Sequence, residues 1–371
     1  MTDKQLLHTP EGVRDIYGLE YRRKLSVQKQ IRKSIAGFGY EAIQTPTFEF
    51  FDVFSKEVGT TPSKDLYKLI DKDGNTLVLR PDFTPSIARC AAKYFMEEEK
   101  PLRFTYEGNT FVNVSHLQGK LKETTQMGAE LILDDSVEAD AELLAMVVSA
   151  LKATGLTKFQ ISVGHMDYFK GLCEEAGLDR SAENNLREAI SGKNMFAARD
   201  ILDTLDIQAD VRQALLEVAD LFGSLQDLSY AKSLVHNTRS IAAIERLEAL
   251  KSLLESYEIA QYISFDLGML SQYHYYTGIV FKAFTYGIGD AIVKGGRYDH
   301  LLEFFGKRAP AVGFMVIVDD ILEALDHQKI AIPVKESAVT ITYTKETFQA
   351  ALKQASDLRR EGKAVILTKE V

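Results

Sequence analysis

The sequence predicts an α+β protein in which an antiparallel sheet is flanked by helices. The main observation is a long hairpin at residues 102–130, whose two halves alternate like half-buried strands around a short polar turn at residues 115–120. A second hairpin is indicated at residues 66–79, where Asp73-Gly74-Asn75 separates two apolar stretches. A long stretch with helical spacing of apolar residues, at residues 166–257, indicates the α part of the fold.

The N-terminal quarter supplies elements that frame these hairpins. Residues 19–38 space their apolar side chains as a helix does, and a glycine at Gly37 or Gly39 ends it. Residues 40–49 have the pattern strand, proline, strand, centred on Pro46. A short helix is expected at residues 87–94.

The middle of the chain continues with a helix at residues 136–153, capped by Asp135 or Ser136, and a strand at residues 159–163. His165 follows, and we expect it to make a structural hydrogen bond rather than to carry chemistry. Two apolar stripes in the helical stretch are expected to be core; they are Val211, Leu215, Val218 and Phe222, and Ile244, Leu247, Leu250 and Leu254.

The last third returns to strand signals at residues 259–267. The C-terminal residues predict a strand at 339–343, a helix capped by Thr344, and a second strand at 364–367. We therefore expect the chain to end in a small βαβ segment.

Composition narrows the class of protein. The chain has 371 residues, of which 46% are hydrophobic, with a net charge of −9. We find no apolar run long enough to cross a membrane and no secretory leader, and so expect a cytoplasmic protein. Cys90 and Cys173 lack metal-binding spacing and are expected to be reduced thiols, with no zinc and no cofactor. The acidic balance argues against tRNA binding, which usually needs a basic face.

Candidate binding residues gather on the returning half of the long hairpin. Gln126 and Glu130 are an even number of positions apart, so an amide and a carboxylate share one face of the sheet. Asp82 and Thr84 come at the end of the preceding strand, beside a helix start. Asp82 has two possible roles, a helix cap and a pocket carboxylate.

The hairpin at residues 102–130 resembles motif 2 of class II aminoacyl-tRNA synthetases, specifically that of the histidyl-tRNA synthetase family. The matching residues are Phe111, Gly119, Glu123, Gln126, Gly128 and Glu130. Five positions that the family fills with charged residues differ here, and they are Val112, Val114, Ser115, Lys120 and Lys122. In the family these charges grip the carboxylate of histidine and the phosphates of ATP, which valine cannot do.

Two later segments resemble the same family. Residues 275–281 match its histidine-specific motif, and Gly295-Gly296-Arg297-Tyr298-Asp299 matches a second family string. The arginine expected in the first motif is Ser271, and the next three residues, Gln272, Tyr273 and His274, also differ. Residues 311–320 stand where motif 3 ends, and its arginine is replaced by Asp320.

The resemblance implies a histidine-binding set without catalytic or metal residues. Asp82 and Gln126 are expected at the ammonium, and Glu130 and Tyr276 at the imidazole. The full set is Asp82, Thr84, Gln126, Glu130, Tyr275, Tyr276 and Tyr298. Because three arginines that would stabilise the reacting phosphates are missing, at Val112, Ser271 and Asp320, synthetase activity is not expected.

A retained pocket with lost catalysis resembles the regulatory subunits of ATP phosphoribosyltransferase. The resemblance implies a homodimer, formed through the region of Pro46, that joins the short-form catalytic subunit in a hetero-oligomer in the first step of histidine biosynthesis, with feedback by free histidine. Two alternatives remain open, a degenerate histidyl-tRNA synthetase and a free-standing histidine-sensing pseudo-synthetase. The implied domains are a core at residues 1–165 and 258–325, a helical insertion at 166–257, and a tail at 326–371 that resembles the start of an anticodon-binding domain.

Overall fold

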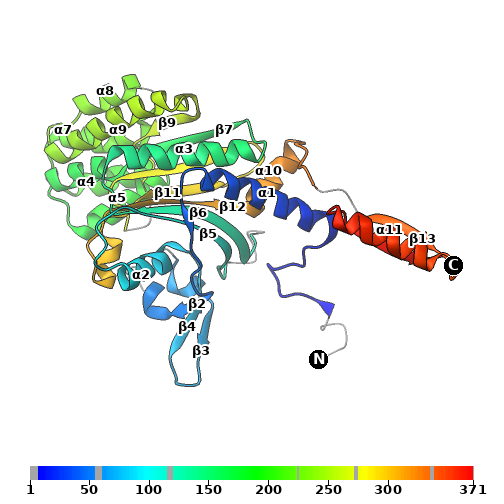
Figure 1. The fold of residues 1–371 in the computed structure, drawn as a ribbon. Coiled ribbons are helices and arrows are strands. Elements are labelled where there is room, and N and C mark those ends of the chain that lie inside the picture. Colours follow the sequence, from blue (N-terminus) through cyan, green and yellow to red (C-terminus); the bar gives the residue numbers. More distant parts are fainter. Residues whose placement is uncertain are drawn as a thin grey trace.

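The computed structural model describes residues 7–54, 61–114, 120–223, 225–270, 275–334 and 338–370. Across these residues nine strands form one sheet, in the spatial order β1-β5-β6-β12-β11-β10-β7-β9-β8 (Figure 1). Their bounds are β1 Glu41–Ala42, β5 Leu102–Phe111, β6 Glu123–Ile132, β7 Phe159–His165, β8 Phe222–Gly223, β9 Ile263–Asp266, β10 Ile279–Thr285, β11 Val293–Arg297 and β12 Ala311–Ile317. The pairs are antiparallel except β1 with β5 and β7 with β9, which are parallel.

Strands β5 and β6 form the predicted hairpin, and β12 pairs with the other edge of β6. The turn at residues 115–119 lies outside the described residues. The period of two separates the side chains of β6 into two sets. Met127, Ala129 and Leu131 point into the main core, whereas Gln126 and Glu130 point to the opposite face.

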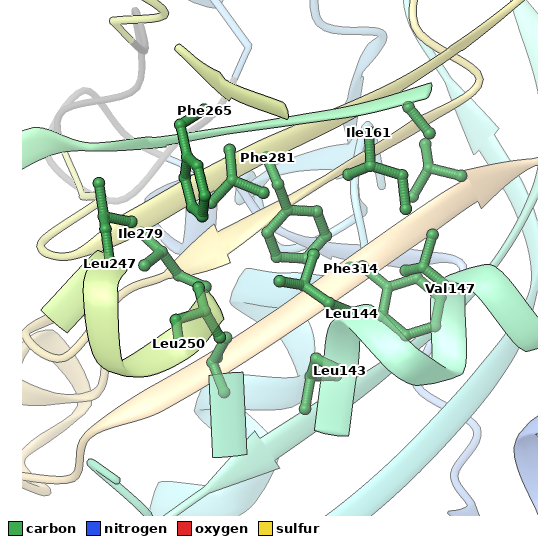
Figure 2. Packing of buried hydrophobic residues seen from close by; sticks show 14 of the residues in the cluster. Leu143, Leu144, Val147, Ile161, Leu247, Leu250, Phe265, Ile279, Phe281 and Phe314 are labelled. Carbon is green, nitrogen blue, oxygen red and sulfur yellow. The ribbon is translucent and has the colours of Figure 1, made fainter. Parts of the chain in front are cut away.

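Helices cover the core face of the sheet. Three helices, α1 (Gly18–Ala36), α3 (Val137–Ala153) and α9 (Thr238–Ser256), pack with the sheet around one apolar core. Figure 2 shows Leu143, Leu144 and Val147 of α3 meeting Phe281 and Phe314 of the sheet. Ser136 caps α3 as predicted, because its hydroxyl accepts from the Ala139 N–H at 3.1 Å.

The other face carries a smaller apolar cluster beneath α2 (Thr84–Tyr94) and the 3₁₀ turn Leu301–Phe305. Phe83 stacks on Tyr106 of β5 with ring centroids 4.5 Å apart. The helix starts three residues earlier than predicted because Asp82 accepts from the Thr84 N–H at 3.1 Å and Pro85 occupies the first turn. This helix start lies beside Gln126 and Glu130.

Between β7 and β9 the chain forms the predicted helical insertion. Besides α9 its helices are α4 Met166–Glu175, α5 Arg180–Ser191, α6 Met195–Asp203, α7 Ala209–Glu217 and α8 Leu225–Ser233. His165 caps α4, since its Nδ1 accepts from the Asp167 N–H at 3.2 Å. The insertion shares its apolar core with the sheet and adds β8 to the sheet edge, so the two parts pack as one body. The domain division remains a prediction.

Two smaller units complete the fold. A three-stranded sheet contains β2 (Phe48–Phe50), β4 (Thr76–Leu79) and β3 (Lys68–Ile70) in that order. After α10 (Val318–His327), a βαβ unit of β13 (Val339–Tyr343), α11 (Phe348–Arg360) and β14 (Val365–Lys369) projects from the core (Figure 1). Its two strands pair in parallel, as the tail pattern predicted.

Three sequence expectations were wrong in detail. Phe222 is 56% exposed because it lies in the edge strand β8 and not in the core stripe of a helix. The residues after Ile259 begin as a 3₁₀ turn, so the strand is shorter than predicted. Thr344 does not cap α11 directly; the helix begins at Phe348 after a turn in which the Thr344 hydroxyl bonds Thr347.

Candidate functional site

A cavity of about 1140 Å³ opens over the face of the sheet that carries Gln126. Its floor comes from β6, β11 and β12, and its walls come from the start of α2, from α10 and from the N-terminal segment. Six of the seven predicted binding residues line it together, and they are Asp82, Thr84, Gln126, Tyr275, Tyr276 and Tyr298. The structure therefore brings residues from three distant parts of the sequence to one site.

Glycines on three neighbouring strands make room for the side chains of the site. A Cβ on Gly296 would lie 2.7 Å from the Tyr276 ring, and one on Gly128 would lie 2.4 Å from the Tyr106 hydroxyl. On β12, a Cβ at Gly313 would lie 1.5 Å from Glu130 Oε2. The glycines that match the family motifs are thus required by the close approach of the pocket side chains.

Glu130 lies behind the cavity wall and is not among its lining residues. Only 1% of the residue is exposed. Its carboxyl group accepts from the Thr84 hydroxyl at 2.7 Å and from the Tyr298 hydroxyl at 2.5 Å. Burial raises the pKa of Glu130 to about 8, against the lowering effect of these two hydrogen bonds. Glu130 therefore holds two lining residues in place.

Gln126 contributes a buried polar atom without a described partner to the site. It is 7% exposed, and its Oε1 is buried with no hydrogen-bond partner among the described residues. A buried acceptor without a donor costs free energy. Asp82, on the same cavity, accepts the Thr84 N–H, so it both caps α2 and faces the site.

Aromatic rings form one wall of the cavity. The rings of Tyr275 and Tyr276 are 4.6 Å apart between centroids, and Tyr298 meets Tyr275 edge-on at 6.0 Å. Tyr106 adjoins them and donates its hydroxyl to the Phe314 carbonyl at 3.3 Å. Tyr106 lies in the first strand of the predicted hairpin, and nothing in the alternating pattern indicated that it would meet the site.

The cavity also receives Arg14, Glu20 and Arg23 from the N-terminal segment and α1, which the sequence did not indicate as site residues. Its lining includes four lysine or arginine residues, and each is already paired with a carboxylate. Arg14 pairs with Glu20, Arg23 with Asp326, and Lys120 and Lys294 both pair with Asp290. Within the described lining there is no uncommitted lysine or arginine.

Two of the positions where the family has arginine lie in the cavity. Val112 lines it as an apolar residue, and Asp320 lines it as a carboxylate. Burial, together with the nearby Asp290, Asp319 and Glu323, raises the pKa of Asp320 to about 6. The predicted changes at residues 115 and 271–274 lie outside the described residues.

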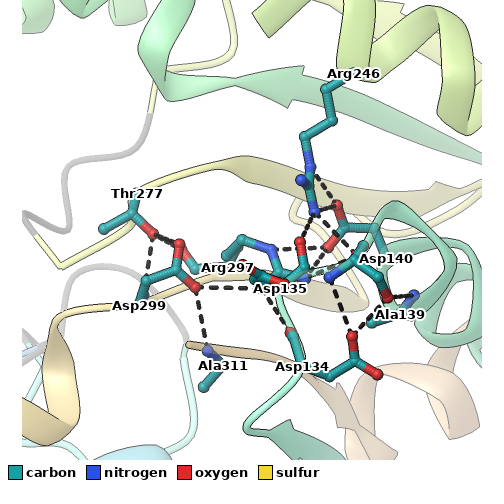
Figure 3. A network of polar contacts seen from close by, with 10 residues as sticks. Asp134, Asp135, Ala139, Asp140, Arg246, Thr277, Arg297, Asp299 and Ala311 are labelled. Atoms are coloured by element: carbon teal, nitrogen blue, oxygen red, sulfur yellow. Dashed lines mark hydrogen bonds and ion pairs between the residues drawn. The ribbon is translucent and has the colours of Figure 1, made fainter. Parts of the chain in front are cut away.

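A buried ion network includes Thr277 and Arg297, the chain neighbours of Tyr276 and Tyr298 (Figure 3). Asp140 of α3 accepts from Arg297 at 2.7 Å and from Arg246 of α9 at 2.8 Å. Arg297 precedes Tyr298, and it also bonds Asp299, which in turn accepts from the Thr277 hydroxyl at 2.8 Å. The network thus ties the backbone on either side of the tyrosines to the helical insertion.

Other functional features are few. In the part of the chain that the structure describes, no group of histidine, cysteine, aspartate and glutamate could hold a metal ion. Cys90 and Cys173 are free thiols. No described helix is long and apolar enough to span a bilayer. The cytoplasmic location stays a prediction.

The fold defines a protein of the class II aminoacyl-tRNA synthetase type. The family model described as histidyl-tRNA synthetase matches residues 12–321. A histidyl-tRNA synthetase from Nostoc has the same fold, with a TM-score of 0.82 at 20% identity over 98% of this chain and 86% of that one.

Sequence identity is higher to several ATP phosphoribosyltransferase regulatory subunits than to the Nostoc synthetase. An ATP phosphoribosyltransferase regulatory subunit from Acetivibrio thermocellus is 39% identical over 97% of this chain and 86% of its own. One from Clostridium kluyveri is 37% identical over 96% and 91%. A Bacillus halodurans C crystal structure of an ATP phosphoribosyltransferase regulatory subunit/histidyl-tRNA synthetase has a TM-score of 0.89 at 32% identity, covering 98% and 93%. The chain belongs to the ATP phosphoribosyltransferase regulatory subunits of the histidyl-tRNA synthetase family, and it is therefore regulatory, not catalytic on its own.

Proposed function

We propose that this chain forms a homodimer that assembles with the short-form catalytic subunit of ATP phosphoribosyltransferase, and that its cavity binds free histidine as a feedback signal in histidine biosynthesis. The names of its relatives support the partner. The cavity supports the ligand, since it combines acceptors for an ammonium group with a tyrosine wall suited to an imidazole ring.

The buried Oε1 of Gln126 carries the ligand assignment. An ammonium group donates three hydrogen bonds and would satisfy this oxygen. Asp82 lines the same cavity and supplies a carboxylate for the ammonium charge. Tyr276 belongs to the aromatic part of the lining, beside Tyr275, where an imidazole ring would lie. Glu130 acts through Thr84 and Tyr298, which it holds by hydrogen bonds.

Adenylation of histidine needs positive charge at the reacting phosphates, and the described lining of this cavity has no lysine or arginine outside an ion pair. The described lysines and arginines of the lining are paired, and Asp320 adds negative charge where the family has arginine. Loss of one preorganised donor typically costs about a hundredfold or more in rate. We expect neither histidine-dependent exchange of pyrophosphate into ATP nor tRNA charging. Exchange in a preparation free of host synthetase would instead support the degenerate synthetase.

Gln126→Leu tests the ligand site. Leucine removes an acceptor that has no described partner, so the free energy of unfolding should stay equal or rise, whereas histidine binding should weaken about tenfold or more. Gln213→Leu on α7, outside the cavity lining, is the control. Calorimetric titration measures binding. Unchanged affinity in Gln126→Leu would remove the histidine assignment.

The regulatory role is tested by reconstitution. The chain should co-purify with the short-form catalytic subunit, and transferase activity should be compared with and without histidine. The same measurement with Gln126→Leu or Tyr276→Phe links the cavity to inhibition, because an effector regulates only through its different affinity for two states. Unchanged inhibition alongside lost binding would place feedback at another site. A chain that senses histidine without binding the transferase would support the free-standing pseudo-synthetase.

A further inference from the structure

A free amino acid carries a carboxylate as well as an ammonium group, so a site that binds it should offer positive charge for the carboxylate. The lining of this cavity is mainly acidic. Among its described lining residues, eight are aspartate or glutamate and four are lysine or arginine. The four basic side chains are held by Glu20 of α1, Asp290 before β11 and Asp326 of α10, in the pairs given above. Asp319 is paired as well, with Lys24, which is not a lining residue. The described lining therefore carries more acidic than basic side chains.

Two side chains of the lining, Gln126 and Asp320, bear on which ligand the cavity can accept. Gln126 contributes a buried oxygen that lacks a donor, which calls for a hydrogen-bond donor on the ligand. Asp320 of α10 also lines the cavity, together with Asp290, Asp319 and Glu323. Burial first, and then these three carboxylates, raise its pKa. An ammonium group is favoured beside Gln126, and a carboxylate is opposed by the acidic side chains of the lining.

Apolar side chains stand where the family has charged residues that bind the carboxylate of histidine. Val112 and Val114 line the cavity next to Thr110 and Thr124, and neither valine can donate a hydrogen bond. A carboxylate moved from water into such a site loses hydration without gaining a counter-charge. An amine without a carboxylate avoids this cost.

We infer that the cavity selects an imidazole-bearing amine without a free carboxylate, and that free histidine binds less tightly than such an amine. The inference rests on the proposed binding of histidine in this cavity. It adds which imidazole-bearing amines the cavity binds more tightly than histidine. Histidine is then a modest ligand whose amine and imidazole are recognised and whose carboxylate is tolerated.

The test is a calorimetric titration series on the full chain with four probes. Histamine lacks the carboxylate, histidinamide has it neutralised, histidine retains it, and imidazolepropionate keeps the carboxylate but lacks the amine. We expect histamine and histidinamide to bind about tenfold tighter than histidine, with imidazolepropionate weakest. Because screening weakens charge interactions, added salt should reduce histamine affinity more than histidine affinity.

Two variants test whether the negative charge of the lining causes this difference in affinity. Asp320→Asn should narrow the gap between histamine and histidine, whereas Asp357→Asn on α11, outside the cavity lining, should leave it unchanged. Equal or tighter binding of histidine by the wild type would overturn the inference and leave the proposed function standing. Failure of every probe to bind would overturn both.

Discussion

The carboxyl group of Glu130 on β6 lies against Gly313, its paired residue on β12, so closely that a Cβ at position 313 would stand 1.5 Å from Glu130 Oε2. The space over Gly313 is therefore part of the Glu130 site. Through its hydrogen bonds to Thr84 and Tyr298, the same carboxyl joins α2 to the strand end that carries the pocket tyrosine.

Gly313→Ala should displace this carboxyl and break both hydrogen bonds. Overpacking of a well-packed site typically costs about 1–3 kcal/mol, and we expect a loss of that size in the free energy of unfolding, together with weaker histidine binding. Gly289→Ala is a matched control, since Gly289 also lines the cavity but a Cβ there would have nothing within 4 Å. Equal stability of the two variants in urea titrations would contradict this packing argument.

Stability should depend on pH through Glu130. Its folded pKa of about 8 exceeds the ordinary value of 4.5, so between these values the folded chain holds a proton that the unfolded chain has released. The free energy of unfolding should therefore fall as pH rises from 4.5 to 8. Glu130→Gln cannot titrate and should show a smaller fall. Urea titrations at pH 5, 6.5 and 8 measure both slopes, and parallel slopes would contradict the assignment.

The buried network of Figure 3 should be sensitive to its central acid. Asp140 is fully buried between Arg297 and Arg246, so Asp140→Asn leaves the buried Arg297 and the partly exposed Arg246 without their shared counter-charge. We expect a cost of about 3–5 kcal/mol in the free energy of unfolding. Arg239→Gln, on the same helix α9 as Arg246, breaks more exposed ion pairs and should cost less than about 1 kcal/mol. Similar losses would mean that the network contributes little.

The small sheet offers a surface for the proposed dimer. Phe48, Phe50 and Leu69 are 55%, 56% and 47% exposed, and the register places Phe50 and Leu69 on either side of Leu77. Such a patch just after Pro46 suits a two-fold contact, which needs a self-complementary surface.

Phe50→Glu should convert the dimer to a monomer in light scattering at micromolar concentration. Phe196→Glu, at an 82% exposed position of α6, should remain dimeric. A monomeric wild type would contradict the dimer, and a dimeric Phe50→Glu would place the contact elsewhere.

The sequence predicted those features that depend on local pattern. Alternation identified β5 and β6, and the period of two placed Gln126 and Glu130 on one face. It could not show that Glu130 would lie behind the cavity, because that depends on Gly313 and Tyr298, which lie far along the chain and meet it only in the sheet. The contribution of Arg14 and Arg23 likewise depends on how α1 crosses the sheet.

Phe222 shows the limit of helical periodicity as a guide. Its spacing from Val218 matched a helix stripe, but the chain leaves the helical path after Asp220 and pairs with β9. Tertiary pairing decided the outcome there, and it left the aromatic side chain exposed.

The pairing of β7 with β9 has a consequence for how the chain is made. Ile161 pairs with Ile263 across the whole helical insertion, and β10, β11 and β12 follow only after it. Contacts of such long sequence separation form slowly, because the entropy of loop closure is lost before the contact forms and stabilises the chain. During synthesis the ribosome must release the insertion before the strands bearing Gly296 and Gly313 can dock. We expect the cavity to form last, so that only a finished chain can respond to its ligand.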